Sequence, residues 1–147
     1  MDNKERLAKL AALLDGDEQE ALAFIRECKE IRKRNFVSFI DKYIDGHGIQ
    51  RSFIIREANL NPQYGYKLLN GTKHTNNRNI IIRICFAIRM NIENTQEALR
   101  CYNMRLLDVE VFRDEIIMAG IEKGKTLYEV DEWLCRAGQV SLFEDCT

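Results

Sequence analysis

Apolar side chains recur three and four residues apart through most of the chain, and no segment alternates regularly between apolar and polar residues. Because this spacing places apolar groups on one face of an α-helix, the pattern predicts an all-α protein. The expected helices cover residues 2–14, 17–33, 36–45, 51–58, 62–69, 79–90, 94–102, 109–122 and 127–137.

The first two helices are expected to form a hairpin. Asp15, Gly16 and Asp17 interrupt the pattern between them, and the first helix carries a narrow leucine stripe at positions 7, 10 and 14. This stripe either covers the following domain or pairs with a second copy of the chain. The second helix is expected to end at the cations of residues 32–34, since positive charge favours a helix C-terminus. The same cations could equally contact phosphate.

A sharp turn is expected between two of the short helices. Asn59 lies where the chain must turn, and Asn tolerates a positive φ better than most residues. Asn61 is expected to cap the next helix, and Pro62 occupies its first position, where a missing N–H costs nothing. Asn70-Gly71 is a usual C-terminal stop. Two helices joined by so short a turn form a helix-turn-helix arrangement.

This stretch resembles the phage-repressor (Cro-like, XRE) helix-turn-helix family of small bacterial and phage transcriptional regulators. The resemblance covers residues 36–97 or so and implies a lambda-repressor-like core. We therefore expect an N-terminal helical hairpin (1–34), a helix-turn-helix DNA-binding domain (35–104) and a C-terminal two-helix extension (105–147). The matching features are Ala58-Asn59-Leu60-Asn61 in the turn, Leu68 and Asn70-Gly71 closing the second helix, and the apolar helix at 79–90.

Two positions depart from the family pattern. The family usually has Ala where this chain has Ile55, and a branched residue where this chain has Gly65. A bulky residue on the first helix needs a hole on the second, which a glycine supplies at a helix-propensity cost of about 1 kcal/mol. We therefore expect Ile55 to pack directly over Gly65.

Charge is unevenly distributed along the chain. Residues 31–90 carry eleven Lys and Arg against three Asp and Glu, whereas residues 1–30 carry five against eight and residues 91–147 carry six against twelve. A basic block that coincides with the helix-turn-helix is expected of a DNA-binding face. The alternative explanations are chance segregation of charge and attraction between segments of the same chain.

The helical period indicates which side chains of the second helix face outward. Gly65 and Leu68 must face inward with Leu60, which turns three candidates for base contacts outward: Gln63, Tyr64 and Lys67. Candidates for phosphate contacts are Arg51, Lys73 and Arg78, of which Arg51 matches the family position that contacts phosphate. Further candidates are Tyr66, Arg34 and His74.

Other kinds of chemistry find little support in the sequence. The five cysteines are widely spaced without a CxxC pair, and only His47 and His74 could complete a metal site, so we expect no metal and no cofactor. Sequence motifs of hydrolases, nucleotide-binding loops and metalloproteases are missing, and we expect no enzyme. The charged N-terminus and the lack of a long apolar run indicate a cytoplasmic protein.

The sequence thus predicts a sequence-specific DNA-binding transcriptional regulator that places the helix from Pro62 to Leu69 in the major groove of double-stranded DNA. A homodimer is expected, with the C-terminal helices around Trp133 as the first choice for its seam and the N-terminal hairpin as the second. Those C-terminal helices could also hold a protein partner. The alternative function is a helical protein-interaction module, adaptor or antitoxin-like, that uses the same fold without binding DNA.

Overall fold

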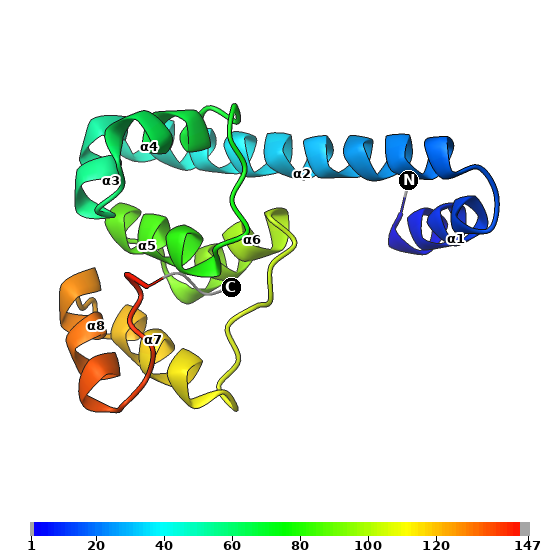
Figure 1. Cartoon of the computed structure of the whole chain (residues 1–147). Coiled ribbons are helices and arrows are strands. Elements are labelled where there is room, and N and C mark those ends of the chain that lie inside the picture. The colour runs from blue at the N-terminus through cyan, green and yellow to red at the C-terminus, as the bar shows by residue number, and fades with distance from the viewer. Residues whose placement is uncertain (1, 145–147) are drawn as a thin grey trace.

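The computed structural model describes residues 2–144, which form eight α-helices and no strand (Figure 1). The predicted all-α class is confirmed. The helices are α1 (Asn3–Leu14), α2 (Glu18–His47), α3 (Arg51–Glu57), α4 (Pro62–Leu69), α5 (Arg78–Ile88), α6 (Ile92–Cys101), α7 (Phe112–Glu122) and α8 (Leu127–Arg136).

The long helix α2 replaces two predicted helices. It runs without interruption from Glu18 to His47, so the predicted helix end at residues 32–34 is wrong, and the expected domain boundary falls inside the helix. The physical reason is local: residues 32–35 are polar but include no glycine or proline, and Lys and Arg are good helix formers. Gly48, with a φ of 64°, provides the stop instead.

An arm formed by α1 and the first half of α2 projects from the rest of the molecule (Figure 1). Asp2 and Asp17 cap its two helices through their side chains. Because α1 packs back along α2 and lies away from the other helices, its leucine stripe does not cover the following domain. Leu7 and Leu14 are 70% and 67% exposed.

The main core lies between the second half of α2 and helices α3 to α6. Helix α5 runs through its centre, where nearly every side chain is buried. The edge-to-face contact between Phe36 and Tyr102, at 4.8 Å between ring centroids, ties α2 to the end of α6. The sequence predicts a capping box of Asn94 with Glu97 at the start of α6. This prediction is wrong, because Asn91 caps the helix by accepting from the backbone N–H of Asn94.

Helices α7 and α8 form a second layer beside α5 and α6 (Figure 1). For the last helix the sequence predicts a capping box of Thr126 with Glu129, and this box is present at the start of α8. Cys85 is buried, as expected of a core cysteine, whereas Cys135 is exposed; Cys146 lies outside the described residues. Within residues 2–144, no helix is both long and apolar enough to cross a bilayer, and no cluster of side chains could hold a metal ion.

Candidate nucleic-acid interface

The turn between α3 and α4 has the predicted backbone. Asn59 adopts a φ of 55°, and the N–H of Leu60 donates to the carbonyl of Ile55 at 2.9 Å. The side chain of Asn61 accepts from the N–H of Tyr64 at 3.2 Å, and Pro62 follows as the first residue of α4. These local bonds hold the start of α4 in place.

Arg83 on α5 supports the same turn from inside the protein. Its Nε donates to the carbonyl of Ala58 at 2.9 Å and an Nη donates to the carbonyl of Asn59 at 2.8 Å. The side chain is buried, and the guanidinium lies 5.1 Å from the ring centroid of Phe143. Our sequence analysis did not identify this role, because Arg83 sits in an apolar helical pattern that does not show where a long side chain ends.

The predicted contact between Ile55 and Gly65 is confirmed. A Cβ atom placed on Gly65 would lie 2.9 Å from Cγ1 of Ile55 and 3.1 Å from its Cγ2. Both residues are buried. The glycine therefore lets α4 approach α3 closely enough for the isoleucine to fill the space that a side chain would occupy.

The outward face of α4 carries three exposed side chains, Gln63, Tyr66 and Lys67. Gly65 and Leu68 lie on the opposite, buried face, as the helical period predicted. Tyr64 is half-buried and packs against the main core, so it contributes less to the outer face than we expected. Tyr66, which the sequence left between the two faces, is 45% exposed.

No acidic residue lies on this helix, in the turn before it, or in the loop and helix that follow it. Residues 58–92 contain neither Asp nor Glu. The segment includes α4, the loop that follows and all of α5. In that loop the backbone N–H of Lys73 donates to the carbonyl of Lys67 at 3.0 Å, and Lys73 is exposed. The exposed surface of α4 and its loop is therefore polar and cationic.

Arg51 begins α3 and is exposed, but it has a partner inside the protein. Its Nη donates to the carboxylate of Asp41 on α2 at 2.5 Å, and both side chains are about 40% exposed. An ion pair this open to solvent contributes on the order of 1 kcal/mol or less. Arg51 is thus held in one orientation by a contact weak enough to be exchanged.

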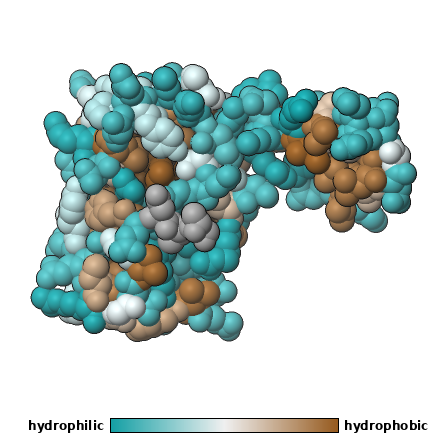
Figure 2. All heavy atoms as spheres, in the orientation of Figure 1, coloured by the Kyte–Doolittle hydropathy of each residue, from teal (hydrophilic) through white to brown (hydrophobic). Residues whose placement is uncertain are grey.

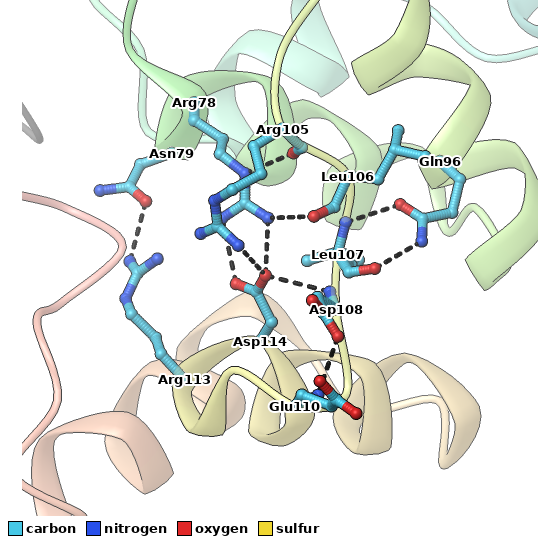
Figure 3. A network of polar contacts seen from close by, with 10 residues as sticks. All are labelled: Arg78, Asn79, Gln96, Arg105, Leu106, Leu107, Asp108, Glu110, Arg113 and Asp114. Carbon is cyan, nitrogen blue, oxygen red and sulfur yellow. Dashed lines mark hydrogen bonds and ion pairs between the residues drawn. The ribbon is translucent and has the colours of Figure 1, made fainter.

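Arg78 does not lie on this surface, which corrects its predicted role. Its Nε donates to the carbonyl of Arg105 at 2.8 Å, one Nη donates to Asp114 at 3.1 Å, and the other contacts Asp114 at 2.9 Å and the carbonyl of Leu106 at 3.2 Å (Figure 3). Its side chain is only 13% exposed. Arg78 therefore attaches the start of α5 to the C-terminal layer and is removed from the candidate phosphate contacts.

Asp114 is the centre of that attachment. Its carboxylate is fully buried and also accepts from Arg105 at 2.8 Å and from the N–H of Asp108 at 3.1 Å (Figure 3). Burial by itself raises the pKa of Asp114, but the hydrogen bonds and the charge of Arg78, together with Asp108 and Arg105, hold the pKa below its ordinary value. The carboxylate is therefore ionised at neutral pH, and the cluster is a structural clamp.

His74 and Arg34 have different surroundings. The His74 ring stacks on Tyr102 with 4.8 Å between centroids, and its Nε2 lies 3.1 Å from the side-chain oxygen of Asn76. Burial lowers the pKa of His74, so the ring is neutral at pH 7 and does not supply the cation that a phosphate contact needs. Arg34 is exposed on α2.

Arg56 on α3 is an exposed cation that our sequence analysis passed over. Its side chain is 72% exposed and lies 3.7 Å from Glu57. It borders a hollow of about 390 Å³ between α3 and α4, together with Ser52, Asn59 and Tyr66. The sequence does indicate that Arg56 is exposed, because it lies one helical turn after Ser52 and on the face of α3 opposite the apolar Ile54.

Comparison with protein-family models, with curated proteins and with solved structures finds no match to this chain. A functional assignment therefore depends on the chain's own residues.

Proposed function

We propose that this protein is a sequence-specific DNA-binding transcriptional regulator of the helix-turn-helix type, with α4 entering the major groove. The observation that carries the proposal is the outer face of α4, where Gln63 and Lys67 are exposed side by side on a helix without acidic neighbours along residues 58–92. A helix of this kind, held at its N-terminus by a tight turn, suits the groove geometry of such proteins.

The side chains of α4 divide into different roles. Gln63 can make a paired contact to adenine N6 and N7, and Lys67 can donate to guanine O6 and N7. Tyr66 replaces Tyr64 as the better placed aromatic side chain, because it is more exposed, and it can lie against a thymine methyl group. These contacts would set the sequence preference.

Phosphate contacts are assigned to cations on either side of α4. Arg51 and Arg56 lie on α3, and Lys73 lies in the loop after α4. Binding requires Arg51 to exchange or share its contact with Asp41, which a phosphate can compete for because the ion pair is open to solvent. Such contacts give affinity and register without sequence preference.

The test is a mobility-shift assay on DNA selected from a random library, at two salt concentrations. We expect retardation that weakens steeply with salt, because each phosphate contact releases a counterion. Gln63→Ala with Lys67→Ala should change which sequences are retained, whereas Arg51→Ala should weaken all sites alike. Lys125→Ala is the matched control, since it removes an exposed cation from the turn before α8. If neither the Gln63 and Lys67 pair nor Arg51 alters retention, the assignment of α4 is wrong.

One observation favours the alternative, a protein-interaction module. The hollow between α3 and α4 has an apolar lining from Ile55, Leu60, Pro62 and Tyr66, and aromatic groups such as Tyr66 are enriched in protein interfaces. This alternative predicts that no selected DNA is retained and that Tyr66→Ala affects partner binding. The same assay therefore separates the two functions.

A further inference from the structure

We infer that the projecting arm is an interface between two copies of this chain, paired antiparallel so that the tip of each arm lies against the base of the other. The inference extends the proposed function by naming the surface through which two copies meet. The inference rests on the proposed function only because regulators of that kind are expected to act as two copies. Its test measures self-association and not DNA binding.

The first argument is that the arm is incomplete on its own. No described residue of α1 is buried, and the first half of α2 buries only Ala21 and Phe24. A helix of 12 residues is marginal in water without an apolar face packed against a neighbour. An arm with so little burial therefore needs another surface to cover it.

The second argument is the apolar surface that remains. Leu7 and Leu14 of α1 are 70% and 67% exposed, and Leu22 and Ile25 of α2 are 41% and 43% exposed. A hollow of about 260 Å³ runs between the two helices, with Leu10 and Phe24 among its apolar lining. Figure 2 shows apolar residues gathered on the arm, away from the main body. Because the arm projects, the chain's own domain cannot reach this surface.

The third argument is charge, which indicates that a second copy of the chain covers this apolar surface. At the tip, residues 15–25 carry Asp15, Asp17, Glu18 and Glu20 and no Lys or Arg. At the base, residues 31–40 carry Arg32, Lys33 and Arg34 and no Asp or Glu. An antiparallel pair places each acidic tip beside the other copy's basic base and brings the two apolar stripes together near Ile25. A parallel pair would place like charges together.

Such a pair has the symmetry expected of a homodimer. A two-fold axis requires one patch that complements itself, and an arm that is acidic at its tip, basic at its base and carries exposed apolar side chains on α1 and on residues 22–25 meets that requirement. Lys33 already contacts Glu30 of its own helix at 2.8 Å, so Arg32 and Arg34 are the cations offered to the tip.

The experiment measures the mass of the full chain in solution at micromolar concentrations by light scattering and by sedimentation. We expect a dimer for the natural chain and a monomer for Leu7→Glu with Leu14→Glu. Because both leucines are exposed in the single chain, the variant should keep its helical circular dichroism. The matched control is Trp133→Glu on α8, where the indole is 56% exposed, and it should remain dimeric.

A charge-reversal set tests the antiparallel direction. Glu18→Lys alone and Arg32→Glu alone should each raise the dimer dissociation constant by about tenfold, and the two together should restore most of the loss. A monomeric natural chain would overturn the inference. So would dissociation by Trp133→Glu without any effect of the leucine variants. If the arm pairs as stated but selected DNA is not retained, the proposed function fails and this inference stands.

Discussion

The contact between Ile55 and Gly65 predicts that one added methyl group at position 65 lowers the free energy of unfolding. Gly65→Ala would place its Cβ 2.9 Å from Cγ1 and 3.1 Å from Cγ2 of Ile55. These are atoms next to the branch point of the isoleucine, so they cannot move away by rotation of a side-chain end. Overpacking of this kind costs about 2 kcal/mol, while alanine gains about 1 kcal/mol over glycine in a helix. We expect a net loss of about 1 kcal/mol in the free energy of unfolding.

The same substitution should have the opposite sign once Ile55 is shortened. Ile55→Ala alone leaves a cavity and costs about 2–5 kcal/mol. In that background the three atoms nearest to the methyl of Gly65→Ala are gone, so the helix-propensity gain of about 1 kcal/mol remains. The coupling between the two positions is then about 2 kcal/mol, within the range measured for residues in contact.

The assay is urea unfolding of the natural chain, the two single variants and the double variant, followed by circular dichroism. Gly65→Ala should lower the midpoint in the natural background and raise it in the Ile55→Ala background. If Gly65→Ala changes stability equally in both backgrounds, the two side chains do not compete for the same space and the packing argument is refuted.

Four further outcomes follow from the surroundings of Asp114, Gly120 and Gly46. Asp114→Ala should cost about 3 kcal/mol in urea unfolding, because it leaves the mostly buried Arg78 guanidinium without its carboxylate. The lowered pKa of Asp114 lies below its unfolded value of about 3.9, so its stabilisation is present above that pH and is lost as the pH falls through the folded pKa. Melting temperatures measured from pH 7 down to about pH 2 should accordingly fall less steeply for Asp114→Asn than for the natural chain, with the difference arising below about pH 4. Gly120→Ala should destabilise by about 2 kcal/mol or more, because its Cβ would lie 2.3 Å from Cγ2 of Val130. Gly46→Ala, whose Cβ would meet nothing within 4 Å, should instead be neutral or stabilising by up to about 1 kcal/mol.

Local signals in the sequence predicted most helix ends correctly. Asn61 and Thr126 act as the expected caps, and Asn59 has the expected positive φ. Each of these depends on chemistry within three or four residues, which a sequence shows directly. The cap at Asn91 was missed because Asn94 offers the same chemistry three residues later, and the choice between them depends on how α6 meets α5.

Contacts between distant segments could not be predicted in this way. A count of charges places Arg78 and Arg83 in the basic block, yet both guanidinium groups point inward to carbonyl or carboxylate oxygens. A long flexible side chain can reach several surfaces, and the partner of Arg78, Asp114, lies 36 residues further along the chain. The direction of the arm was equally hidden, because the apolar stripe of α1 suits a domain or a second copy.

The unbroken α2 has a geometric consequence. Its 30 residues make a rod roughly 45 Å long that joins the arm to the packing of α3 and α4. Each residue of an α-helix adds 1.5 Å of rise and about 100° of rotation, so one residue inserted near Asn35 would turn everything beyond it by more than a quarter of a circle relative to the arm. Inserting a block of seven residues would restore the phase to within about 20° while lengthening the rod by roughly 10 Å. The number of residues in α2 therefore sets both the distance and the relative rotation between whatever is bound at its two ends.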